Sequence, residues 1–169
     1  MQAEERKMKI LNSTEKKKIL EQLEQFGIEK LNYLLFQTGK EKIRGYSGNL
    51  SIQEINMLAR TIRVEIIGLY LFKQDLGLRL SLDATQILKP SKKIINTNDI
   101  QAQSWLKGED LNITTNQQGF VIIKHNQDFL GSGKAAGNLI LNFIPKERRL
   151  KWVLIITQEK KSVFSKEPI

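Results

Sequence analysis

The stretch that decides the fold lies at residues 119–143 and reads GFVIIKHNQDFLGSGKAAGNLILNF. It contains apolar runs at 119–124, 129–135 and 139–143, each of a length typical of a short strand, and polar or glycine-containing turns separate them. Short strands at this spacing predict a small β-barrel. We expect further strands of the same barrel at 92–95, 111–113 and 151–157.

Helix signals surround this stretch. Asn98 or Asp99 is placed to cap a helix that runs through Leu106 and ends at Lys107-Gly108. In the first half of the chain, a helical pattern begins at Thr14 and breaks at Gly27. A second short apolar stripe follows over 31–36, and then a loop or hairpin edge over 39–50. A helix with a Ser51–Glu54 capping box is expected to run through Leu58. Strands are expected at 61–72 and 78–82, before a short helix capped by Asp83.

Together these patterns predict an α+β protein with two parts. An N-terminal α/β domain over 13–88 follows a flexible N-terminus at 1–12. The barrel occupies 89–157, and residues 158–169 form a tail.

The charge balance points to a polyanionic partner. Lys and Arg number 27 against 18 Asp and Glu, which gives a net charge of +9. Residues 87–151 carry ten of the basic groups and five of the acidic ones. Such a surplus favours RNA or DNA over an anionic membrane. The start lacks the pattern of a secretory signal and no apolar run is long enough to span a bilayer, so we expect a cytoplasmic protein without membrane contact.

Catalytic and metal chemistry find little support in the sequence. Cysteine is absent, which excludes disulfides, thiolate metal sites and cysteine nucleophiles. Residues 130–134, LGSGK, lack both the earlier glycine and the later Ser or Thr of a phosphate loop. The spacing of Gly131, Gly133 and Ala136 fits a dinucleotide fingerprint, but no helix pattern follows, so a turn and bulge between barrel strands is expected instead. His125 is the only histidine, and we interpret it as an exposed turn residue. No cofactor, metal or catalytic residue is predicted.

The strongest basic stretch is IPKERRLK at 144–151. Arginine offers a planar fork that matches phosphate, and lysine offers a point charge. The alternative is a basic surface loop that only improves solubility.

Trp105 and Trp152 could stack on unpaired bases, but their apolar neighbours favour packing in the core or at its rim.

Several of these segments resemble the PUA domain, a small β-pseudobarrel of RNA-modifying enzymes and ribosome-assembly factors. They are SWLKGEDL at 104–111, GFVII at 119–123 and FLGSGKA at 129–135. The extension NFIPKERR at 142–149 looks like the PUA-type tail of 5-methylcytosine RNA methyltransferases. In the first half, the order of elements is similar to the pre-PUA domain that precedes PUA in a small ribosome-biogenesis factor.

The resemblance implies RNA binding between the first barrel helix with its Gly turn and the late barrel strands. The matching positions are Lys107, Gly108, Gly131, Gly133 and Lys134. The charge pattern adds Lys146, Arg148, Arg149 and Lys151.

The resemblance does not extend to methyl transfer, because 5-methylcytosine chemistry requires a cysteine nucleophile. We therefore predict a non-catalytic protein that binds ribosomal RNA or the ribosome, with tRNA as a possible target and ribosomal or RNA-modification proteins as possible partners. The alternatives are an RNA-targeting subunit of a methyltransferase or pseudouridine synthase, and a small-molecule enzyme that uses the glycine turn.

Overall fold

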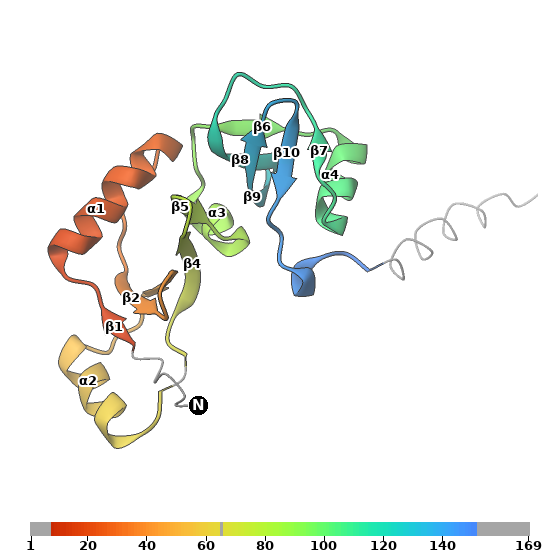
Figure 1. Ribbon diagram of the computed structural model, residues 1–169. Coiled ribbons are helices and arrows are strands. Elements are labelled where there is room, and N and C mark those ends of the chain that lie inside the picture. Colours follow the sequence, from red (N-terminus) through yellow and green to blue (C-terminus); the bar gives the residue numbers. More distant parts are fainter. Residues whose placement is uncertain (1–7, 65, 152–169) are drawn as a thin grey trace, which may run out of the picture.

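The computed structural model describes residues 8–64 and 66–151, which form two five-stranded sheets (Figure 1). The first sheet is antiparallel, in the order β1-β2-β3-β4-β5. We call this sheet and its helices α1 and α2 the N-terminal unit. Its elements are β1 (Lys9–Ile10), α1 (Ser13–Leu23), the 3₁₀ turn η1 (Glu24–Phe26), β2 (Leu34–Thr38), β3 (Lys42–Tyr46), α2 (Ile52–Thr61), β4 (Leu69–Gln74) and β5 (Leu78–Leu80).

The second sheet curls into a half-barrel in the order β6-β8-β9-β10-β7, and only its β6–β8 pair is parallel. We call this sheet, α4 and the segment that follows them the barrel. Its elements are β6 (Ile94–Asn96), α4 (Asp99–Lys107), β7 (Leu111–Asn112), β8 (Gly119–His125), β9 (Asp128–Ala136), β10 (Leu139–Asn142) and η2 (Lys146–Arg148). The predicted α+β fold with a small barrel is confirmed.

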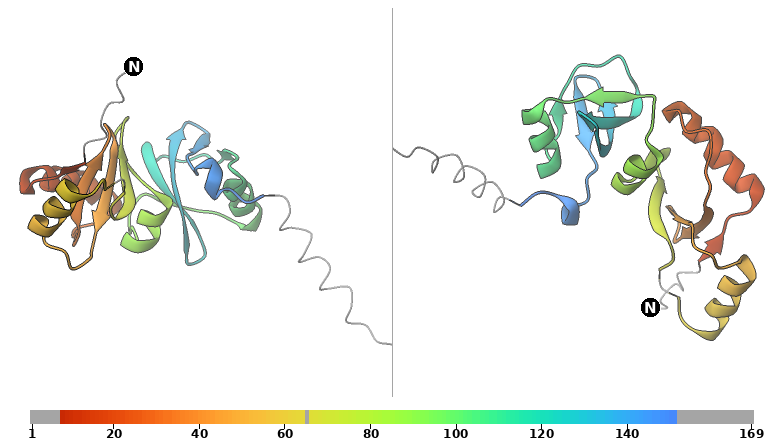
Figure 2. Two further views of the ribbon diagram at one scale, coloured as in Figure 1. Left: turned by 90° about the horizontal axis from the view of Figure 1, so that it is seen from below. Right: turned by 180° about the vertical axis from the view of Figure 1, so that it is seen from behind.

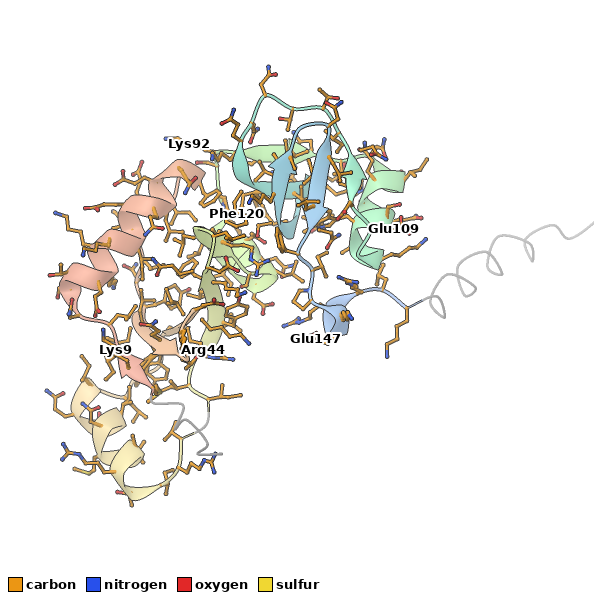
Figure 3. The ribbon with its side chains drawn as sticks, in the orientation of Figure 1. Lys9, Arg44, Lys92, Glu109, Phe120 and Glu147 are labelled. Carbon is orange, nitrogen blue, oxygen red and sulfur yellow. The ribbon has the colours of Figure 1, made fainter. Side chains whose placement is uncertain are left out.

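Strand β8 explains the apolar run that marked the fold. Phe120 and Ile122 pack into a core shared with α1 and the first sheet, whereas Val121 and Ile123 pack into a second core beneath α4. Because successive side chains of a strand point to opposite faces, a strand buried on both faces needs a continuous apolar sequence. Figure 3 shows Phe120 where the two units meet.

The two units are held together by contacts as well as by the chain that connects them. Helix α3 (Leu82–Leu88) contacts both β4 and β9. The connection after it is also fixed, because the backbone N–H groups of Ser91 and Lys92 both donate to the carbonyl oxygen of Phe26, at 2.9 and 3.0 Å. The units lie side by side in both views of Figure 2. No helix among the described residues is long and apolar enough to cross a membrane.

Four local expectations differ from the structure. Residues 8–12, placed in a flexible N-terminus, contain β1 and Asn12, which caps α1. The apolar stripe over 31–36 ends in β2, whose Leu35 and Phe36 are buried on opposite faces of the sheet. This burial on both faces gave the run its helix-like spacing. Helix α3 is capped by Ser81 rather than Asp83, since the Ser81 Oγ accepts from the N–H of Ala84 at 3.0 Å.

The fourth difference concerns the strand expected over 61–72. Helix α2 extends to Thr61, and pairing with β3 begins only at Leu69. Gly68 has a φ of +67°, and a Cβ at this position would overlap the carbonyl group of Gly45. The chain therefore turns tightly at Gly68, and the ladder does not extend further back. The strand expected over 151–157 and the tail at 158–169 lie, except for Lys151, outside the described residues.

Candidate nucleic-acid interface

Helix α4 presents Lys107 and Gly108 at one end of the barrel. The helix begins at Asn98, whose side chain accepts from the N–H of Gln101 while the Gln101 side chain accepts from the Asn98 N–H. It ends at Gly108, which has a φ of +92°. Glycine enters this left-handed region without the steric penalty of a side chain. Both predicted boundaries of the helix are confirmed, with Asn98 as the cap.

The basic stretch returns to this helix end. The Leu150 N–H donates to the Leu106 carbonyl at 2.9 Å, and the Arg149 Nε donates to the Ile144 carbonyl at 3.0 Å. The Arg149 guanidinium lies over Gly108, where a Cβ would stand 2.5 Å from its Cζ. Gly108 and Arg149 are far apart in sequence, and the fold places them in contact.

Asn142 holds this return path in place, and the sequence analysis missed it. Its Nδ2 donates to the carbonyl oxygens of Trp105 and Glu109 at 2.8 and 3.0 Å, and its Oδ1 accepts from the N–H of Ile144 at 2.8 Å. One amide thereby satisfies carbonyls at the end of α4 and starts the turn that leads to the basic stretch. A lone Asn at a strand end carries no distinctive sequence signal, because its partners belong to another element.

Arg148 faces the other way. Its Nη2 donates to the Asp83 Oδ2 at 2.9 Å, which links η2 to the start of α3. The basic stretch is therefore held on one side by α4 and on the other by α3 (Figure 1). Lys146 and Lys151 remain exposed between and beyond these anchors.

Gly131 and Gly133 are buried within β9, and packing explains both. A Cβ at Gly133 would stand 2.8 Å from the Trp105 ring and 2.7 Å from Ile140. Gly131 has a φ of +93° and lies where the β8–β9 register shifts, as expected for a glycine in a bulge. Neither glycine opens a helix, and the expected bulge is confirmed. The expected turn between strands is wrong, because both glycines lie within β9.

Lys134 lies apart from Lys107 and Gly108. In β9 it pairs with Phe120 on one side and Leu141 on the other. Because strand side chains alternate, it projects from the face opposite to the one on which Gly133 meets Trp105. The predicted basic site residues thus do not all lie together, since Arg148 also turns away, to Asp83 of α3. We call Lys107, Lys146, Arg149 and Lys151 the α4-end cluster; Lys134 faces the N-terminal unit.

The structure shows where Trp105 and His125 lie. Trp105 is fully buried, and its Nε1 donates to the Leu130 carbonyl at 2.7 Å, which confirms its core position. Trp152 lies outside the described residues. His125 is not an exposed turn residue: its Nδ1 lies 2.9 Å from the Thr97 carbonyl and its Nε2 lies 3.1 Å from the Asp99 carboxylate. Among the described residues, no group of His, Asp and Glu side chains is arranged to hold a metal ion.

The contact between Gly108 and Arg149 gives a testable expectation. We expect Gly108→Ala to lower the free energy of unfolding by about 1–3 kcal/mol, because it adds backbone strain and displaces the arginine. Gly137→Ala is the matched control, since Gly137 has a φ of +65° but a Cβ there would meet none of the described atoms within 4 Å. Urea denaturation followed by circular dichroism measures both. Equal losses in the two variants would show that Arg149 does not depend on this glycine.

Comparison with known proteins identifies the barrel. Residues 92–150 match the family described as the methyltransferase RsmF PUA domain. The barrel is a PUA domain. The match spans β6 to the basic stretch, so it includes α4, the glycines of β9 and most of the α4-end cluster.

Curated relatives agree with this assignment. The chain is 31% identical over 78 residues to the ribosomal RNA small subunit methyltransferases F of Shewanella putrefaciens and Shewanella baltica. The aligned region is 45% of this chain and 16% of each relative, and it is confined to their PUA region. The chain therefore spans only a small part of the length of these enzymes.

A solved structure extends the likeness to both units. A conserved PUA domain protein from Thermoplasma acidophilum superposes with a TM-score of 0.56, covering 81% of this chain and 93% of that chain. At 17% sequence identity the likeness shows a common fold. A fold that spans both the N-terminal unit and the barrel thus occurs in another protein. PUA domains are RNA-binding modules without catalytic activity of their own, and this is the class to which the barrel belongs.

Proposed function

We propose that this chain is a non-catalytic RNA-binding protein of the cytoplasm that acts on ribosomal RNA or the ribosome. The observation that carries the proposal is a PUA domain in which the α4-end cluster gathers four cations from two segments. Arg149 is fixed over Gly108, whereas Lys146 and Lys151 are exposed and able to reach phosphate oxygens. Contacts of this kind bind the RNA backbone and its shape rather than a particular base sequence.

Ribosomal RNA is favoured because the relatives are named for it. They are ribosomal RNA small subunit methyltransferases, and the shared segment is the PUA region alone. The same observation supports a second candidate function. A PUA domain that is joined to a methyltransferase in the relatives could here serve an RNA-modifying enzyme as a separate targeting subunit.

Cross-linking in the native cell tests both candidates. We expect ultraviolet cross-linking of the tagged protein, followed by sequencing of the attached RNA, to give peaks on ribosomal RNA. Cross-linked peptides are expected at the α4-end cluster, in particular around Lys146 and Lys151. Peaks confined to tRNA would move the function to tRNA modification, and co-purification with a methyltransferase or pseudouridine synthase would favour the targeting role. An absence of RNA above background would reject RNA binding.

A further inference from the structure

The N-terminal sheet carries a row of cations across three neighbouring strands. Lys42 of β3 lies opposite Lys73 of β4, and Lys73 lies opposite Arg79 of β5. Their neighbours Ile43, Phe72 and Leu80 point into the core beneath α1. Since side chains alternate, the three cations occupy the face of the sheet turned away from α1. We call Lys42, Lys73, Arg79 and the adjacent Arg44 and Tyr70 the sheet strip.

The strip combines positive charge with an aromatic ring. The Lys42 Nζ lies 5.9 Å from the centre of the Tyr70 ring, and Arg44 lies opposite Tyr70 in the ladder. Figure 3 labels Arg44 on this part of the sheet. Cations beside aromatic rings are the features with which proteins follow a single nucleic-acid strand, because phosphates meet the cations and bases stack on the ring faces.

Two carboxylates lie beside the strip but do not cancel its charge. Lys73 Nζ contacts Asp75 Oδ2 at 2.8 Å and Glu41 Oε2 at 3.2 Å. The hydrogen bonds to Asp75 and Glu41 raise the pKa of Lys73, so this lysine stays protonated throughout the physiological range. With four cations and two carboxylates, the strip retains a net positive charge.

The strip is continuous with the basic stretch of the PUA domain. The Arg79 guanidinium lies 4.2 Å from the centre of the Phe143 ring, and Phe143 lies three residues before Lys146. Five residues after Phe143, Arg148 pairs with Asp83 at the start of α3, directly beyond β5. These two contacts hold the segment 143–148 against the end of the strip. Lys134 projects from the same face of the barrel sheet as its ladder partner Phe120, whose ring meets the Phe143 ring edge-on with centroids 5.9 Å apart.

We propose that the RNA-binding surface extends from the PUA domain onto the sheet strip, which takes a single-stranded segment of the same RNA. The inference rests on the proposed function. Adjacent strands lie about 4.8 Å apart, so the cation row spans about 10 Å. A row of this length can contact more than one phosphate of a single strand. Arg79, stacked on Phe143, joins the two surfaces, while Lys42 and Lys73 contact the backbone.

Two labelled RNA probes test the proposal, a stem–loop with a single-stranded extension and the same stem–loop without it. For the double variant Lys42→Gln with Lys73→Gln, we expect about fivefold weaker binding of the extended probe by the full chain at moderate salt. The slope of log K against log salt is expected to fall by about 1.4, which corresponds to two lost single-strand contacts. Binding of the short probe should not change.

The control is Lys17→Gln with Lys18→Gln, which removes the same charge from exposed positions of α1 on the opposite side of the sheet. The single variant Lys42→Gln leaves the Lys73 ion pairs intact. Its slope of log K against log salt is expected to fall by about 0.7, which corresponds to one lost contact. The proposal is overturned if the strip variants and the α1 control bind the extended probe equally. If the unmodified chain binds neither probe, the proposed function itself fails, which is a separate outcome.

Discussion

Replacing Trp105 with alanine is expected to lower the free energy of unfolding by about 3–5 kcal/mol. Its ring fills the core beneath α4 and rests directly against Gly133 and Ile140, so the neighbouring backbone cannot close the cavity. The substitution also leaves the Leu130 carbonyl without its indole donor. Urea denaturation followed by circular dichroism measures the loss, because tryptophan fluorescence would itself change.

Trp105→Phe separates the two contributions. It keeps most of the ring volume and removes the N–H donor, so we expect a smaller loss of about 1–3 kcal/mol. A loss below about 1 kcal/mol for the alanine variant would contradict the packing described here, since deletion of a buried tryptophan normally costs several times as much.

The second large effect concerns RNA binding. Lys146→Glu combined with Lys151→Glu is expected to weaken RNA binding at least about tenfold at moderate salt, because each phosphate contact releases condensed counterions. Both side chains are exposed, so the fold should tolerate the change. Fluorescence anisotropy with a labelled ribosomal RNA fragment, repeated over a range of salt concentrations, measures affinity and salt slope together.

Lys17→Glu combined with Lys18→Glu provides the control. These residues are exposed on α1, so the variant has the same net charge as the first without altering the α4-end cluster. We expect the slope of log K against log salt to fall by about 1.4–1.8 for the Lys146/Lys151 variant and to change little for the control. If both variants lose affinity equally, binding follows the overall charge of the chain and the α4-end cluster has no special role.

Local signals in the sequence predicted the helix that positions the site. Asn98 and Gln101 are three residues apart and cap each other, and Gly108 provides the positive φ at the helix end. Each of these signals acts within one turn of chain, which is why sequence alone was sufficient. The continuous apolar run of β8 likewise marked a strand buried on both faces.

Features that depend on distant partners could not be predicted in this way. Burial of Leu35 and Phe36 on opposite faces of the first sheet produced a pattern that resembled a helix. Lys134 follows Gly133 directly, but neighbouring residues of β9 lie on opposite faces of the strand. Gly133 therefore meets Trp105, whereas Lys134 lies on the face of Phe120. The contact of Arg149 with Gly108 depends on the path that Asn142 sets at the end of β10. Composition identified the basic stretch, but only the fold shows which helix it meets.

The shared core also limits how this PUA domain can be used in protein engineering. Phe120, Ile122 and Phe129 belong to the barrel by sequence but are covered by side chains from α1 and the first sheet. A graft that began at β6 would carry these three apolar side chains uncovered onto the surface of its new host. Transplanting the RNA-binding module therefore requires either redesign of that face with polar residues or transfer of the whole described chain.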